Sequence, residues 1–130
     1  MSTDFADLTI IGLDTERTRP SSRASGLRHM YLTLSASPSR AWSQLFDQER
    51  QFPRHNMWRR AWIEGNAIVV DCVPEEIALY HLNDLKQDVA EANQKYRQYL
   101  AQSEAEQRRA VEVRAQEQKR LEDLKGRLDF

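Results

Sequence analysis

The sequence predicts an α+β fold, a two-layer sandwich in which a largely antiparallel sheet of about four strands is covered on one face by two helices. Three observations support this fold class. Residues 58–64 and 67–72 are strand-like and joined by a two-residue turn signal, residues 29–36 alternate in polarity, and residues 38–50 and 74–125 have apolar side chains at helical spacing. With one more strand near the N-terminus, the expected element order is ββαββα.

The first two strands are expected before residue 37. Residues 6–13 are rich in β-branched and apolar types, as strands are. Residues 14–26 collect Thr, Arg, Ser, Pro and Gly without periodicity, which is typical of a loop. In residues 29–36 every second residue from Met30 onward is apolar, so this strand should bury one face and leave Tyr31 on the other.

The first helix is expected from Ser37-Pro38 to about Arg50. A serine side chain can cap the free N–H groups of a helix start, and proline at the first helical position lacks an N–H that would be unpaired there. Pro53 prevents much continuation of the helix. Its apolar side chains share one face, and they are Ala41, Trp42, Leu45 and Phe46.

Gly65-Asn66 is the clearest turn signal, because glycine at the first central position suits the type II′ turn of a hairpin. A two-residue loop fixes the strand register. The expected cross-strand pairs are Ile63 with Ile68, Trp62 with Val69, Ala61 with Val70, and Arg60 with Asp71 as an ion pair. The core face then carries Ala61, Ile63, Ile68, Val70 and Cys72, and the opposite face carries Trp58, Arg60, Trp62 and Val69.

The last helix is expected to begin at Pro74, which two carboxylates follow. No glycine or proline then occurs before Gly126, and a continuous helix of about fifty residues would be roughly 75 Å long. An apolar stripe in its first half can lie on the sheet. That stripe consists of Leu82, Leu85, Val89, Ala92, Tyr96 and Tyr99.

Beyond Leu100 the helix changes character. Residues 101–130 include seven positive and seven negative side chains, many spaced for helix-stabilising ion pairs, so this segment can be helical without burying much surface. We therefore expect a compact head at residues 1–100 and a charged helical arm at residues 101–130. The apolar residues become frequent again only near the end of the arm, at Leu121, Leu124 and Leu128.

Composition places the chain in a reducing compartment. The single cysteine, Cys72, cannot form an internal disulfide and lies in an apolar segment. The N-terminus has neither a basic region nor an apolar region of a signal peptide, and no segment is apolar enough to cross a bilayer. We expect a cytoplasmic protein that makes no use of a membrane.

Catalytic and metal-binding constellations are weak. His29, His55, Cys72 and His81 are neither paired at helical spacing nor part of a C-x-x-C motif. His81, Asp84 and Asp88 share a helical face, for which an exposed polar edge is the more ordinary interpretation. The glycines do not form a phosphate-binding loop, and no G-x-S-x-G motif occurs. We expect no metal, no cofactor, no small-molecule substrate and no enzymatic activity.

Nucleic-acid binding is the alternative function. Aromatic rings beside guanidinium groups on an open sheet face would allow base stacking and phosphate neutralisation. Such rings also pair across strands or cover a protein interface, and the net charge of −1 is unlike that of a dedicated nucleic-acid binder. Residues 14–60 nevertheless carry nine arginines against four acidic residues. The candidate arginines are Arg17, Arg19, Arg23, Arg28, Arg54, Arg59 and Arg60.

The leading expectation is a non-enzymatic interaction or oligomerisation module. A long helix that is stabilised only by propensity and ion pairs gains most from a packing partner. The expected partner is a second copy, giving a homodimer, or another protein. A frayed, solvated helix is the alternative for the arm, since its leucines span too few heptads to establish a coiled coil. The candidate partner-binding residues are Tyr31, Trp58, Arg60, Trp62, Leu121, Leu124 and Leu128.

Overall fold

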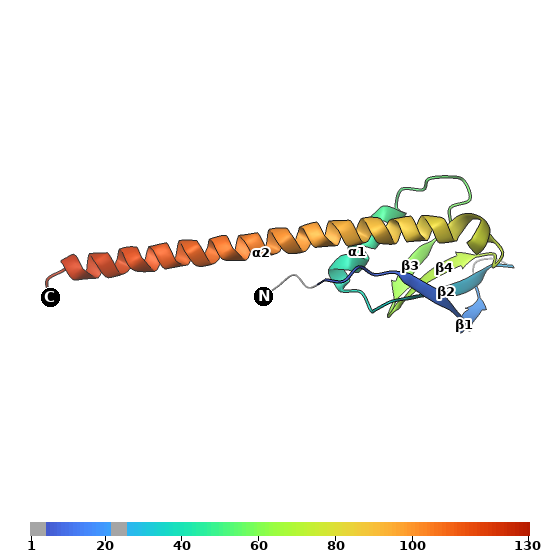
Figure 1. The fold of residues 1–130 in the computed structure, drawn as a ribbon, viewed down its shortest axis with the longest axis horizontal. Coiled ribbons are helices and arrows are strands. Elements are labelled where there is room, and N and C mark those ends of the chain that lie inside the picture. The colour runs from blue at the N-terminus through green and yellow to red at the C-terminus, as the bar shows by residue number, and fades with distance from the viewer. Residues whose placement is uncertain (1–4, 22–25) are drawn as a thin grey trace. The chain divides into compact units, whose positions relative to one another are not determined.

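The computed structural model describes residues 5–21 and 26–130. It has an α+β fold with a four-stranded antiparallel sheet in the order β1-β2-β4-β3, which confirms the predicted class. In chain order the elements are β1 (Ile10–Pro20), β2 (Arg28–Leu34), α1 (Arg40–Arg50), β3 (Ala61–Glu64), β4 (Ala67–Cys72), the π-helical segment η1 (Ile77–His81) and α2 (Leu82–Arg127) (Figure 1).

Besides the short α1 and the long α2, the chain has a third helical segment, η1, between β4 and α2, so the order differs in part from the predicted ββαββα. The last helical segment begins at Ile77, not at the predicted Pro74. The backbone N–H of Leu82 donates to the carbonyl oxygen of Ile77, the wide hydrogen bond of a π turn. The chain forms two compact units, one of residues Phe5–Tyr96 and another that contains Arg97–Phe130.

The predicted loop at residues 14–26 is wrong over its first half. β1 continues to Pro20, and Arg19 is aligned with His29 of β2. The register is irregular between Asp14 and Arg19, where Asp14 Oδ1 accepts hydrogen bonds from the backbone N–H groups of Glu16 (3.1 Å) and Arg17 (3.3 Å). Pairing with β2 on either side of this irregularity keeps the polar segment extended. Its side chains do not alternate between apolar and polar, so the sequence pattern did not predict a strand here.

The helix α1 begins at Arg40, two residues after Pro38, the predicted first helical residue. Ser39 is the N-terminal cap, and its Oγ accepts a hydrogen bond from the backbone N–H of Trp42 at 3.1 Å. The predicted end at Arg50 is confirmed. Several serines precede this helix, and Ser39 is the one that places the cap three residues before a buried tryptophan.

The hairpin register is confirmed. Ala61 is aligned with Val70, Trp62 with Val69 and Ile63 with Ile68, and Gly65 has a φ of +59° as its turn requires. β3 is shorter than predicted: it begins at Ala61, so Trp58 lies before the strand. The backbone N–H of Asp71 still donates to the carbonyl oxygen of Arg60 at 3.0 Å, which keeps that pair in register.

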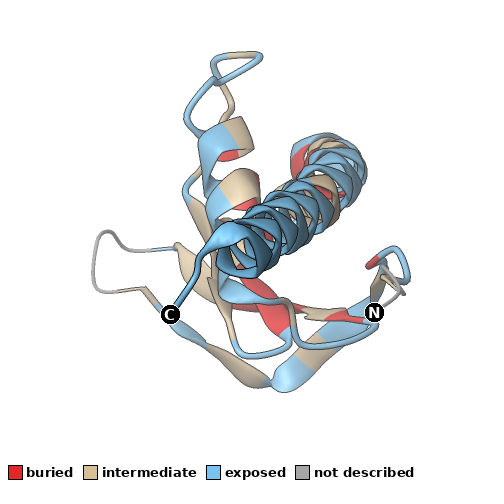
Figure 2. Cartoon of the chain, turned by 90° about the vertical axis from the view of Figure 1, so that its left-hand side faces the viewer, coloured by how far each residue is buried: buried red, intermediate tan, exposed pale blue. Residues whose placement is uncertain are grey.

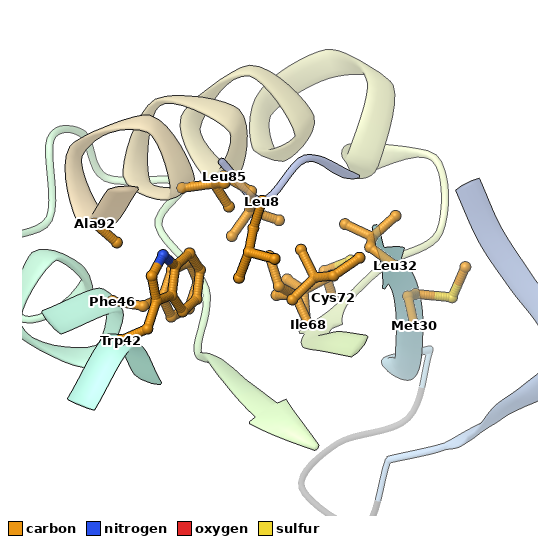
Figure 3. Packing of buried hydrophobic residues seen from close by; sticks show 12 residues of the cluster. Leu8, Met30, Leu32, Trp42, Phe46, Ile68, Cys72, Leu85 and Ala92 are labelled. Atoms are coloured by element: carbon orange, nitrogen blue, oxygen red, sulfur yellow. The ribbon is translucent and has the colours of Figure 1, made fainter. Parts of the chain in front are cut away.

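The core of the Phe5–Tyr96 unit lies between one face of the sheet and the helices α1 and α2 (Figure 3). Trp42 and Phe46 of α1 stack with ring centroids 5.7 Å apart. Buried Asn93 of α2 accepts hydrogen bonds at Oδ1 from Trp42 Nε1 (2.9 Å) and from the backbone N–H of Leu8 (3.1 Å). The core face of the hairpin is as predicted, with Ile68, Val70 and Cys72 buried and Ala61 and Ile63 packed against them.

Candidate interaction surfaces

The face of the sheet opposite the helices is not an open aromatic surface, contrary to expectation. Tyr31 is only 1% exposed and packs with Val69, Ala67 and Trp62 in a second apolar cluster. The face assignment of Tyr31, Val69 and Trp62 is therefore confirmed, but the exposure of Tyr31 and Val69 is not. The ring of Tyr31 cannot stack on a base in this arrangement.

Two arginines of β1 cover Tyr31. The Arg17 guanidinium lies 4.3 Å from the centre of the Tyr31 ring, a cation–π contact. Arg19 Nη2 donates to the Tyr31 hydroxyl at 3.1 Å, and that hydroxyl donates to Glu64 Oε1 at 3.3 Å. The unexpected extension of β1 thus closes this face, and it gives Arg17 and Arg19 a packing role.

Trp58 lies apart from Tyr31, on the loop between α1 and β3. Its ring packs against the Arg50 guanidinium at 3.8 Å and against His55 with ring centroids 5.5 Å apart. Its indole Nε1 donates to the carbonyl oxygen of Arg50 at 3.1 Å. The structure therefore divides the predicted aromatic patch into two groups of residues.

A buried ion-pair network links this loop to α2. Arg50 Nη1 donates to Asp88 Oδ2 at 2.9 Å, and Arg54 Nη2 donates to Asp88 Oδ1 at 2.5 Å. His55 Nε2 lies 2.5 Å from Asp84 Oδ2. Burial lowers the pKa of Arg50, while the hydrogen bond and charge of Asp88 act in the opposite direction. Since Asp88 is fully buried with charged partners on both oxygens, it stabilises the loop only as long as both arginines are in place.

A second polar group lies around η1, the segment that precedes α2. Arg59 contacts both carboxylate oxygens of Glu76, with Nε at 3.2 Å and Nη2 at 3.3 Å. His81 Nε2 lies 3.3 Å from Glu76 Oε1, and burial lowers the pKa of this histidine. His81 and Asp88 are buried, so the expected exposed polar edge of the helix is wrong for both. Across residues 5–21 and 26–130, no cluster of His, Cys, Asp or Glu is arranged to hold a metal ion.

The candidate arginines are largely engaged within the chain. Arg54 and Arg59 form the ion pairs described above, and Arg28 Nη1 donates to the carbonyl oxygen of Leu27 at 3.0 Å. Arg23 lies outside the described residues. Arg60 is exposed, with its guanidinium 5.0 Å from the centre of the Trp62 ring. Arg60 therefore remains the candidate best placed to meet an external anion.

Arg60 borders a shallow depression of about 390 Å³. Trp58 and Trp62, the tryptophans that precede and follow Arg60, both contribute to its wall. Asp47 also lines it, and burial raises the pKa of that carboxyl. The depression brings back together three of the four residues of the predicted aromatic patch, without Tyr31.

The helical unit presents a different surface. Residues 106–130 are all exposed, and the end of α2 near the C-terminus is coloured as exposed in Figure 2. Exposed ion pairs such as Arg108 with Glu104 (3.5 Å) and Arg120 with Glu117 (3.8 Å) connect successive turns of the helix. Pairs of this kind contribute only about 0.2–0.5 kcal/mol each.

Beyond Leu100, four apolar residues of α2 share one side of the helix, and at about 100° of rotation per residue they fall within an arc of about 80°. Leu128 is the first residue after the end of α2 at Arg127, and it continues the same spacing in the sequence. Leu121, Leu124 and Leu128 are each about half exposed, at 49%, 50% and 51%. We call this set the apolar stripe, and its members are Ala110, Val113, Leu121, Leu124 and Leu128. Spacing in the sequence identified the three leucines but not their alignment with Ala110 and Val113.

Val111 lies outside the apolar stripe. It is 64% exposed, and it points about 120° away from the centre of the stripe. It is therefore a matched position at which apolar surface can be removed without changing the stripe.

No family model, no curated protein and no solved structure matches the chain. Within the described residues, no helix has both the length and the apolar composition required to span a membrane. The surfaces of this chain are therefore the basis for assigning its function.

Proposed function

We propose that the protein is a non-enzymatic interaction module whose helical unit, Arg97–Phe130, binds another helix through the apolar stripe. One observation carries the proposal. The stripe brings together three half-exposed leucines at the end of a helical unit whose surface is otherwise mostly charged or polar. Covering the exposed half of a leucine side chain is worth about 0.75–1.5 kcal/mol, more than the roughly 0.2–0.5 kcal/mol that an exposed ion pair of this helix contributes.

The physical need for a partner supports the proposal. Propensity and exposed ion pairs each add only a little to the stability of this helix, whereas in folded proteins most of the stability of a helix comes from packing of its apolar face. A partner that covers the stripe would add apolar burial along one side and leave the ion pairs hydrated.

A stripe variant tests the proposal. In the full-length chain, Leu121, Leu124 and Leu128 are all replaced by glutamine, which removes apolar surface and retains high helix propensity. The control variant is Val111→Gln. Light scattering at increasing protein concentration should give a mass above 15.2 kDa for the wild type and for the control, and 15.2 kDa for the stripe variant.

A different partner protein gives a second readout of the same proposal. If the wild type is monomeric, immobilised wild type and Val111→Gln should both retain one protein from the host extract that the stripe variant does not retain. The proposal is wrong if all three proteins behave alike in both measurements.

A second candidate function is binding of single-stranded nucleic acid at the depression beside Arg60. The observation in its favour is that Trp58, Arg60 and Trp62 line one hollow, which offers ring faces and a guanidinium together. Trp62→Ala combined with Arg60→Ala should then weaken oligonucleotide binding at least about tenfold, since stacking is worth about 1–3 kcal/mol per base. Binding should also fall steeply with salt. The same affinity in both proteins would exclude this candidate.

A further inference from the structure

We propose that the partner of the helical unit is the same segment of a second copy, paired with it in antiparallel orientation about a centre between Val113 and Arg114. This inference rests on the proposed function and adds the identity and direction of the partner. Polar residues interrupt the apolar stripe at certain positions, and these positions indicate both which segment the partner is and in which direction it runs.

Three polar residues lie on the side of the helix that carries the stripe, namely Ser103, Glu106 and Glu117. Each lies three or four residues from its neighbours in this series of positions, which keeps it on that side of the helix. A partner helix must therefore place something compatible against each of them.

Antiparallel pairing about the proposed centre matches every one of these polar residues with an apolar member of the stripe. Ser103 lies opposite Leu124 of the second copy, and Glu106 lies opposite Leu121 of the second copy. Glu117 lies opposite Ala110 of the second copy. The two-fold symmetry repeats each contact, so a self-complementary interface forms from one set of residues.

Charge complementarity favours the same arrangement. Glu106 lies beside Arg120 of the second copy, and Glu117 lies beside Arg109 of the second copy, since arginine precedes the residue opposite in each case. The Arg120 side chain already reaches the edge of the stripe, where it lies 3.8 Å from Glu117 of its own chain. The stem of each arginine can cover apolar surface while its guanidinium meets the carboxylate.

Parallel, in-register pairing has the opposite consequence. Glu106 would face Glu106 of the second copy, and Glu117 would face Glu117 of the second copy, so two like-charge pairs would form within the contact. Such pairs disfavour that orientation.

Disulfide trapping in the full-length chain distinguishes these arrangements. Ser103→Cys and Leu124→Cys are prepared separately, and helix content is compared with that of the wild type by circular dichroism. Each variant alone, and an equimolar mixture of both, is equilibrated in a glutathione redox buffer, and disulfide-linked dimers are identified by mass. The native Cys72 does not interfere, because it is buried and burial raises its pKa to about 12, which leaves almost no reactive thiolate.

The mixture should yield at least about tenfold more linked dimer than either variant alone, since in the antiparallel pair the thiol introduced by Ser103→Cys meets only the thiol introduced by Leu124→Cys. Val111→Cys, alone or mixed with Ser103→Cys, is the control and should yield no more dimer than the wild type.

The remaining outcomes overturn the inference in separable ways. Strong linkage in Leu124→Cys alone would show a parallel pair, and the proposed function would stand. No linkage in any mixture, together with a partner protein retained only when the stripe is intact, would show a different partner. No linkage and no effect of the stripe on any binding would remove both the inference and the proposed function.

Discussion

The two ends of α2 use charge and apolar surface in opposite ways. Near its start, the charged side chain of Asp88 is fully buried and the apolar side chain of Leu85 completes the core. Near its end, charged side chains are hydrated and Leu124 is half exposed. A buried charge is tolerated when its partners are supplied by the chain itself, whereas exposed apolar surface in a regular stripe is the ground on which we propose a partner outside it.

The largest effect is expected from a charge that is introduced on the closed face of the sheet, where it would be buried without a partner. Val69→Asp should prevent folding of the Phe5–Tyr96 unit, because Val69 is fully buried between Tyr31 and Trp62. An unpaired carboxylate there costs several kcal/mol, which is comparable to the stability of a small domain. Loss of near-ultraviolet circular dichroism would show the effect. A variant with a native spectrum would mean that this face opens readily.

Removal of one partner from the buried network should have the next largest effect. Asp88→Ala leaves Arg50 and Arg54 without their shared carboxylate and should lower the free energy of unfolding by about 3–5 kcal/mol. Asp84→Ala is the control on the same side of the helix, and it should cost much less because Asp84 is partly exposed. Urea denaturation measures both. Equal losses in the two variants would contradict the network of ion pairs around Asp88.

A pH titration tests the second polar group. Burial lowers the pKa of His81 in the folded chain below its ordinary value of 6.5, so in this range the unfolded chain binds more protons. The contribution of His81 to the free energy of unfolding is therefore fully present above pH 6.5, and it is lost as the pH falls below that value. Urea midpoints at several pH values should decline less steeply between pH 7 and 5 in His81→Gln than in the wild type, over roughly that range. Parallel profiles would show that His81 is protonated equally in both states.

The smallest effect is expected in the helical unit. Arg108→Gln removes an exposed ion pair with Glu104 and should leave the free energy of unfolding of the Phe5–Tyr96 unit unchanged. Helix content should fall only slightly, since one such pair is worth about 0.2–0.5 kcal/mol. Far-ultraviolet circular dichroism with and without high salt is the measurement. A large loss of helix would mean that ion pairs, and not a partner, hold this segment helical.

Local signals in the sequence predicted the hairpin well. A two-residue turn with glycine at its first position determines the register by itself, so the pairing of Ile63 with Ile68 followed directly. The extension of β1 to Pro20 was not predictable in this way, because it depends on pairing with β2 and on contacts with Tyr31, which local sequence does not reveal. The burial of Tyr31 and Val69 depends on that extension, which is why their exposure was mispredicted.

The same distinction applies to the candidate surfaces: local spacing predicted some of their residues, and the placement of others depends on distant parts of the fold. The leucines near the end of α2 were identified from spacing alone, since no other part of the chain needed to be known. Trp58 was placed with Tyr31 because a continuous strand from residue 58 was assumed, yet β3 begins at Ala61. The one available signal for the buried network was the pair Asp84 and Asp88 at helical spacing, and it could not reveal that Arg50 and Arg54 would lie beside it.

The central claim is that the apolar stripe, and not apolar surface in general, is the contact surface of the helical unit. Sedimentation equilibrium of the single variants Leu124→Gln and Val111→Gln tests it most directly. Because a symmetric pair uses Leu124 twice and about half of each side chain is left to be covered, Leu124→Gln should raise the dissociation constant of the dimer at least about tenfold, from roughly 0.75–1.5 kcal/mol lost per copy. Val111→Gln should leave that constant within about threefold of the wild-type value. Equal constants for the two variants would contradict the claim.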